Sequence, residues 1–248
     1  MTDAERYDYE DFTEESYRRI VRAAKARYAF EPFGTAATVP HALWRHDVDV
    51  SVHRALELAR IEHDEGVRAT YLLQLHSGFY SLLERSALAA AREVFELGHW
   101  AGLHFDAGFY GEATREELET RLNRERELLA ELIERPVEVF SFHAPEAAGV
   151  ESLEDERIAG MISTYARSIR DGYEYVSDSN GYWRHRRLPE ILEEDGHERL
   201  HVLTHPEWWQ REPMSPRERL ERAVRGRADR TLADWESWTY RHSRDIPG

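Results

Sequence analysis

The chain has 248 residues, of which 41% are hydrophobic, and its formal net charge is −15. This acidic balance argues against a general nucleic-acid-binding protein, because contacts with phosphates need a basic surface. No apolar run approaches the roughly 20 residues that a membrane span needs, and without cysteine the chain has no disulfide and no thiolate metal site. Any bound metal must therefore have histidine, aspartate or glutamate ligands.

The first predicted element is an amphipathic helix over about residues 14–30, where apolar residues recur at near-helical spacing. The segment before it is acidic and lacks a basic region followed by an apolar one, which predicts no secretory signal and a cytoplasmic protein. A strand over 42–49 follows, and then a helix that begins at Ser51 as N-cap and ends at Gly66.

Strands and helices continue to alternate along the rest of the chain. Further strands are predicted over 67–75, 100–106, 137–143, 173–179 and 198–205, and further helices over 81–98, 114–136 and 215–226. Thr114 and Glu117 have the spacing of a capping box. This alternation favours a parallel sheet with helical crossovers, either a barrel or an open doubly wound sheet. We expect one domain over 1–248, with a C-terminal helical extension over about 215–248.

Residues that carry chemistry stand at the ends of four predicted strands. They are Asp47 and Asp49, His104 and Asp106, His143, and His205. Side chains two apart on a strand share a face. In a parallel α/β barrel, the carboxyl ends of the strands converge where catalytic groups collect. We therefore expect these side chains to lie close together.

This set suits a divalent cation, and three protein ligands with an open position would make a hydrolytic site. The remaining carboxylate and histidine would then serve as base and acid for amide hydrolysis. Each residue also has a simpler interpretation. Asp47 alone could interact with the dipole of the following helix, and a lone His143 or His205 could be a hydrogen-bonded histidine at a strand end. The recurrence at successive strand ends favours the metal site.

The sequence around these residues resembles the polysaccharide deacetylase superfamily, also called NodB-like or carbohydrate esterase family four. Four segments resemble its motifs in order: RHDVD over 45–49, ELGHWAGLHFD over 96–106, FSFHAPE over 140–146 and HVLTHPEWW over 201–209. The resemblance covers roughly residues 40–210. It implies a distorted (β/α) barrel of about seven parallel strands and metal-dependent removal of an N- or O-acyl group, commonly acetate from an amino sugar.

The resemblance also implies roles for single residues. Carried over by position, Asp47 is the general base, Asp49 and His104 are metal ligands, and His205 is the general acid. The implied cofactor is a divalent metal, zinc foremost, with nickel, cobalt or manganese as alternatives.

Two positions depart from the family pattern. A second metal-binding histidine would fall at Gly108, which cannot bind a metal, so Asp106 or His143 must supply the third ligand. His143 also stands where the third motif has an arginine that steadies the base. Arg45 or Arg184 would have to replace that arginine.

Substrate binding is predicted around the segment SDSNGYWR over 177–184, which contains a turn-forming Asn-Gly pair. We interpret it as a loop over the barrel mouth that contacts a polyhydroxylated substrate, with Arg184 able to pair with a phosphate. The alternative is an ordinary surface turn. The tryptophan at 208 either stacks on a sugar or closes the barrel. The predicted substrate-binding residues are Arg45, Asp178, Trp183, Arg184 and Trp208.

The sequence thus predicts a metal-dependent hydrolase that removes an acyl group, acetyl in the first instance, from an amino sugar or a sugar-containing intermediate. The substrate is expected to be small or carrier-linked. A second interpretation keeps the site but assigns a non-sugar amide or a cyclic ureide. A third is a catalytically silent carbohydrate-binding relative, which Gly108 favours and the presence of Asp47, Asp49 and His205 disfavours. No heptad or long apolar stripe indicates an oligomer.

Overall fold

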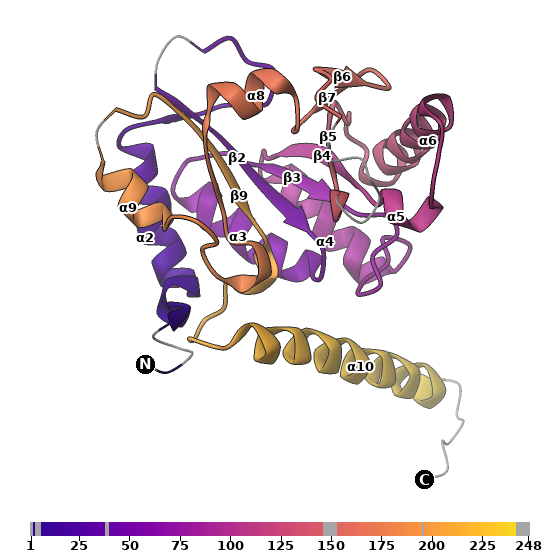
Figure 1. Ribbon diagram of the computed structural model, residues 1–248. Helices are drawn as coiled ribbons and strands as arrows, with labels where there is room; N and C mark the ends of the chain where they lie inside the picture. The colour runs from indigo at the N-terminus through magenta and orange to yellow at the C-terminus, as the bar shows by residue number, and fades with distance from the viewer. Residues whose placement is uncertain (1, 3–5, 38–39, 146–152, 195, 242–248) are drawn as a thin grey trace.

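A curled, mostly parallel sheet forms the centre of the structure (Figure 1). The computed structural model describes residues 2, 6–37, 40–145, 153–194 and 196–241. Within them the strands are β1 (Ala29–Phe30), β2 (His41–Val48), β3 (Thr70–Leu73), β4 (Trp100–Phe105), β5 (Val139–Phe142), β6 (Arg157–Ile158), β7 (Met161–Ser163), β8 (Glu174–Ser177) and β9 (Arg199–Thr204).

The strands pair in the order β6-β7-β5-β4-β3-β2-β9-β8, and the short β1 pairs with β2 beside this path. Every described pair is parallel except β6 with β7. The predicted α/β fold, a distorted barrel of about seven parallel strands, is confirmed in its parallel order and its curvature. Among the described residues the sheet is a half-barrel, because its end strands β6 and β8 do not pair with each other.

Helices cover the outer face of this sheet. The helical elements are η1 (Tyr9–Phe12), α2 (Glu14–Lys25), α3 (Val52–Asp64), α4 (Arg85–Glu96), α5 (Ala107–Tyr110), α6 (Arg115–Ile133), α8 (Arg167–Gly172), η2 (Ser179–Gly181), α9 (Leu188–Glu193), η3 (Pro206–Trp208) and α10 (Pro216–Arg241). Helices α9, α2, α3, α4 and α6 contact one another in that order (Figure 1). None of the described helices combines the length and the apolar character that a bilayer-crossing segment requires.

Local signals in the sequence set several helix ends as predicted. The Ser51 side chain accepts a hydrogen bond from the Arg54 amide at the start of α3. Thr114 and Glu117 form the predicted capping box at the start of α6. Gly66 follows α3 with φ +73°, a left-handed conformation that glycine adopts without strain.

Other predicted boundaries were wrong. Helix α2 ends at Lys25 rather than near residue 30, because the chain turns there and Ala29–Phe30 pairs with β2 as a strand. Helix α4 begins only at Arg85. Helix α10 continues to Arg241, beyond the helix predicted over 215–226 but within the helical extension expected over about 215–248, whose last residues, 242–248, lie outside the described residues. Elements β6, β7, α8 and α9 were not predicted.

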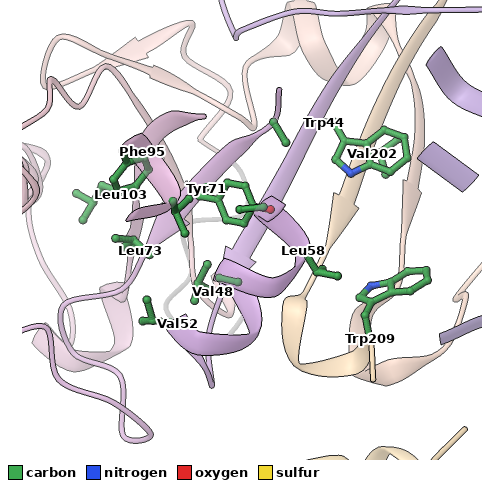
Figure 2. Close-up of a cluster of buried hydrophobic side chains, with 14 of the residues drawn as sticks. Trp44, Val48, Val52, Leu58, Tyr71, Leu73, Phe95, Leu103, Val202 and Trp209 are labelled. Atoms are coloured by element: carbon green, nitrogen blue, oxygen red, sulfur yellow. The ribbon is translucent and has the colours of Figure 1, made fainter. Parts of the chain in front are cut away.

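Strand β2 is buried along its whole length, and its two faces have different partners. On the outer face, Trp44 and Val48 pack with residues of α3 and β3 in the main apolar core (Figure 2). On the inner face, Leu43 belongs to a second, smaller cluster, and Arg45 and Asp47 follow it towards the end of the strand. The members of that cluster are Phe33, Leu43, Val139, Ala166 and Ile169.

A buried polar network interrupts the outer face at His46. Its Nε2 lies 2.8 Å from Glu62 Oε1 on α3, and its Nδ1 lies 2.7 Å from Thr204 Oγ1 on β9. Tyr71 on β3 donates to the second Glu62 oxygen at 2.7 Å, and Tyr17 on α2 donates to the first. Helix α2 and strands β2 and β3 therefore contact one buried carboxylate of α3, and β9 joins the network through His46. Removal of the carboxylate would leave these buried groups unsatisfied.

We predict that Glu62→Ala destabilises the protein by about 3–5 kcal/mol, because it leaves several buried donors without an acceptor. The matched control is Glu57→Ala on the same helix, which removes only a partly exposed pair with Arg60 and should cost less than about 1 kcal/mol. Urea unfolding followed by circular dichroism measures both free energies. Equal losses in the two variants would contradict a structural role for the network.

Candidate metal and active site

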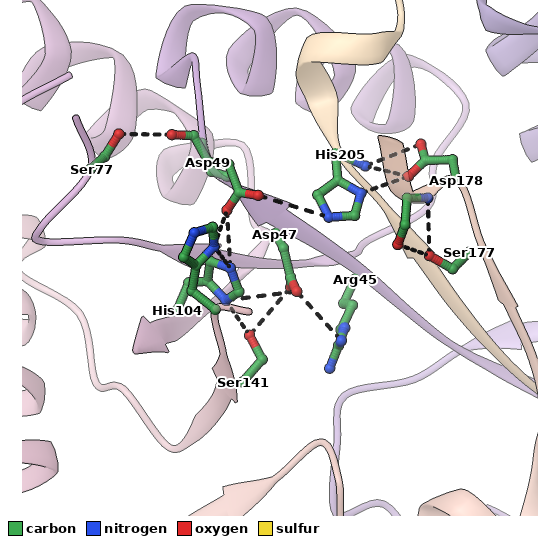
Figure 3. Close-up of polar contacts among 12 residues, drawn as sticks. Arg45, Asp47, Asp49, Ser77, His104, Ser141, Ser177, Asp178 and His205 are labelled. Carbon is green, nitrogen blue, oxygen red and sulfur yellow. Dashed lines mark hydrogen bonds and ion pairs between the residues drawn. The ribbon is translucent and has the colours of Figure 1, made fainter. Parts of the chain in front are cut away.

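Three side chains from three strand ends direct their ligand atoms at one another at the carboxyl edge of the sheet, and Figure 3 labels two of them, Asp49 and His104. Asp49 follows β2, His104 lies on β4 and His143 follows β5. His104 Nε2 lies 3.0 Å and His143 Nδ1 lies 3.4 Å from Asp49 Oδ1, and the two nitrogens are 3.2 Å apart. All three ligand atoms lie within 4.8 Å of one another.

This cluster fits a divalent cation by its own chemistry. Asp49 Oδ1 is buried, and no described group makes a well-aligned hydrogen bond to it. Burial alone would raise the pKa of Asp49, but the facing His104, with His143 and His205, holds that pKa well below its usual range. An ionised carboxylate and two imidazoles directed at one point are a ligand set that zinc and similar metals accept.

A hydroxyl orients the His104 ring. Ser141 lies beside His104 in the β4–β5 register, and its Oγ is 2.6 Å from His104 Nδ1. This contact directs Nε2 towards Asp49, as groups around metal-binding histidines commonly do. The same Ser141 hydroxyl donates to Asp47 Oδ1 at 3.4 Å. The sequence analysis did not single out Ser141, although it stands two residues before His143 on the same strand face.

Asp47 lies next to the cluster with only 2% of its surface exposed. Alternation along β2 places it between Arg45 and Asp49 on the inner face. Arg45 Nη2 lies 3.4 Å from Asp47 Oδ2, and His104 Nδ1 lies 3.7 Å from the same oxygen. Of the two arginines considered from the sequence, Arg45 is the one that contacts Asp47.

His205, after β9, faces the cluster from the opposite neighbour of β2. Its Nδ1 lies 2.7 Å from Asp178 Oδ1, and its Nε2 lies 4.0 Å from Asp49 Oδ2. The two Asp178 oxygens also accept the His205 backbone amide and the Trp209 indole N–H. Burial would lower the pKa of His205, but the hydrogen bond and charge of Asp178, with Asp49 and Glu207, raise it to about 10. This arrangement leaves Nε2 as a proton donor.

The structure places the other predicted residues in different positions. Asp106 does not join the cluster, because β4 ends at Phe105 and Asp106 becomes the N-cap of α5, where it accepts the Phe109 amide. His143 occupies the third position instead. Gly108 lies within the short helix α5.

The predicted substrate contacts are also divided. Asp178 is buried next to His205 and forms a hydrogen bond with its side chain. Trp183 donates a hydrogen bond to Asp11, and its ring packs on Phe12. Arg45, Arg184 and Trp208 line a cavity of about 620 Å³ at this edge of the sheet. The cavity also contains the cluster, Asp47 and His205. The candidate ligands, base and acid therefore open into one space.

No family model and no curated protein matches the sequence. Among solved structures, a CE4 (carbohydrate esterase family four) pseudoenzyme from Bacillus anthracis is 13% identical with a TM-score of 0.43, and the match covers 78% of this chain and 62% of that one. A mutant of it with restored enzymatic activity is 12% identical with a TM-score of 0.43, and the match covers 78% and 64%.

The Streptococcus pyogenes deacetylase PplD, solved in complex with acetate, is 11% identical with a TM-score of 0.42, and the match covers 85% of this chain and 86% of that one. The chain is similar in structure to proteins of carbohydrate esterase family four. The motifs quoted above resemble the same family. The chain spans less than two thirds of the length of the pseudoenzyme chains. At such identities the likeness concerns the fold alone.

We predict that Asp49→Ala, His104→Ala and His143→Ala each lose bound metal, because each removes one of three ligands. Asp106→Ala is the matched control and should retain the metal content of the wild type, since its carboxylate caps α5 instead. Elemental analysis after dialysis against a weak chelator measures this content. Loss of metal in Asp106→Ala with retention in His143→Ala would reverse the assignment.

In metal-free protein, the His205 imidazole should stay protonated through neutral pH, because its pKa is raised to about 10. Its unfolded pKa is about 6.5, so the resulting stabilisation is complete below that pH and is lost as pH rises towards 10. Asp178→Asn should lower the pKa and move this loss to lower pH. NMR titration of the imidazole measures both proteins, and an unchanged midpoint in Asp178→Asn would refute the role of Asp178.

Proposed function

We propose that the protein is a metal-dependent hydrolase that removes an acyl group, acetyl in the simplest case, from the nitrogen of an amino sugar or a sugar-containing intermediate. The observation that supports this proposal is the placement of Asp47 and His205 in one cavity with the Asp49–His104–His143 cluster. Amide hydrolysis needs a group that takes a proton from water and another that gives one to the leaving nitrogen. Asp47 and His205 can serve as these two groups.

Asp49, His104 and His143 would hold the cation, zinc foremost, with nickel, cobalt or manganese as alternatives. When bound, such a cation polarises a carbonyl and makes a neighbouring water more acidic. Ser141 fixes the His104 ring through the 2.6 Å contact to Nδ1.

Asp47 acts as the base in this proposal. Arg45 and Ser141 approach its two oxygens from different sides, which fixes the carboxylate against rotation. Burial excludes bulk water, and Asp47 lines the cavity beside the cluster. Asp47 can therefore take the proton of a water that attacks an acyl carbon held there.

His205 acts as the acid. Its Nδ1 is engaged by Asp178, so the proton available for transfer is at Nε2, which faces Asp49 across the cavity. The Asp178 carboxylate stabilises the imidazolium and fixes its orientation, as expected for a histidine that delivers a proton to a departing amine. Trp209 and the His205 amide hold Asp178 in turn.

We predict that Asp47→Asn retains metal but lowers turnover by about 10²–10⁴-fold, the usual contribution of a positioned base. Turnover is measured as acetate released from N-acetylated amino sugars and from N-acetylated non-sugar amines, and as ring-opened product formed from cyclic ureides. Asp64→Asn, an exposed acid on α3, is the control and should match the wild type.

The outcomes separate the interpretations. Full turnover in metal-loaded Asp47→Asn would remove Asp47 as the base. Turnover of the ureides or of the non-sugar amides alone would assign the same site to another substrate class. Metal binding without turnover of any compound, but with binding of sugars, would support a silent carbohydrate-binding relative.

A further inference from the structure

Arg45 has more hydrogen-bonding capacity than the described protein around it satisfies. Its side chain is on the inner face of β2 and is 2% exposed. One terminal nitrogen, Nη2, lies 3.4 Å from Asp47, and the guanidinium carbon lies 5.7 Å from the centre of the Tyr165 ring. Its Nε and Nη1 are buried and have no well-aligned hydrogen-bond partner among the described residues. Buried N–H groups of a guanidinium are costly when unpaired, and they are usually satisfied by a carboxylate or a phosphate.

Two further buried polar groups without a described partner line the same cavity. They are Thr164 Oγ1, just after β7, and His201 Nε2 on β9, and both residues are 4% exposed. Burial and the charge of Arg45 hold the pKa of His201 well below its usual range. His201 is therefore a neutral imidazole that can donate a hydrogen bond without adding a second buried charge. A cation, a hydroxyl and an imidazole thus face one space.

Two of these residues, Arg45 and His201, lie deeper in the half-barrel than the reacting groups, and Thr164 lies beside Ser141 at the level of the cluster. Arg45 precedes Asp47 by two residues on the same face, which is about 6–7 Å along a strand. In the β2–β9 register Arg45 pairs with Leu203, and His201 pairs with Leu43 of the apolar cluster below. A ligand group bound here would stand one layer of side chains below Asp47.

The charge of the cavity contrasts with that of the chain. Arg45 and Arg184 line it, together with Arg170, which forms ion pairs with neighbouring acids. Its own carboxylates are Asp47 and Asp49, which the base and the metal cluster use. The whole chain carries a formal charge of −15. Arginine side chains gathered in a cavity of such a chain provide a local site for an anion.

We propose that Arg45, Thr164 and His201 form a subsite for an anionic oxygen group, a carboxylate or a phosphate, carried by the substrate. The inference rests on the proposed function for its place in a reaction, because it makes the substrate of that acyl hydrolase an acidic one. Binding itself depends only on the residues of the subsite.

The test compares three N-acetylated sugars that differ in charge: N-acetylglucosamine, N-acetylglucosamine 6-phosphate and N-acetylmuramic acid. Dissociation constants for the metal-loaded wild type are measured by saturation-transfer NMR, and released acetate is followed in the same samples. We expect at least one acidic sugar to bind about tenfold more tightly than the neutral one, and the preference to weaken at high salt. Comparison of the 6-phosphate with the carboxylate sugar identifies which anionic group the subsite binds.

Variants then locate the preference. Arg45→Gln should reduce the ratio of acidic to neutral affinity to about one, and Thr164→Val should weaken acidic binding by about fivefold to tenfold. Thr70→Val is the matched control, because Thr70 Oγ1 is also buried without a described partner but lies on β3 outside this cavity. It should leave all three affinities unchanged. Thr164→Val tests the subsite on its own if Arg45→Gln does not fold.

Equal affinities for all three sugars in the wild type, or an unchanged preference in Arg45→Gln and Thr164→Val, would overturn the subsite. The two proposals fail separately. Tighter binding of an acidic sugar without acetate release would support the subsite and contradict the proposed hydrolase activity. Acetate release without tighter binding of an acidic sugar would support the hydrolase activity and contradict the subsite.

Discussion

The burial of β2 on both faces is the constraint on which the rest of the structure depends. A central strand that carries Arg45, His46, Asp47 and then Asp49 cannot place those groups in water, so each needs a partner supplied by a neighbouring element. On the outer face, Glu62 and two tyrosine hydroxyls form a closed network around His46. On the inner face, the partners are fewer than the polar atoms, and the unsatisfied atoms open into the cavity. The outer face stabilises the sheet, and the inner face retains capacity for ligands.

Much of the sheet and part of the site could be predicted because they depend on short-range rules. The alternation of side chains along a strand places Asp47 and Asp49 together, and the parallel order of the strands brings His104, His143 and His205 to the same edge. Helix caps such as Ser51 and the capping box of α6 depend on neighbours three residues away. A pattern in one segment is sufficient for the side-chain alternation and the caps, and the shared edge follows from the parallel sheet that alternating strands and helices predict.

The remaining features depend on contacts between segments distant in sequence. Asp106 has the spacing of a ligand, but the strand ends one residue before it and its side chain caps a helix. Asp178 belongs to the segment interpreted as a substrate-binding loop, but the pairing of β8 with β9 places it next to His205. Trp183 turns to Asp11, near the other end of the chain. The short β6, β7, α8 and α9 have too few residues for a clear periodicity.

The insertion of β9 between β2 and β8 has a consequence for how the molecule is made. One edge of β2 pairs with β9, which begins at Arg199, more than 150 residues later in the chain. During synthesis that edge stays open, with its backbone groups exposed to pairing with other chains. Such long-range closure is slow, because much loop entropy is lost before the contact forms. His205 follows β9 directly, so the proposed acid joins the proposed base and metal ligands only when β9 pairs, and a nascent chain that lacks β9 has an incomplete candidate site.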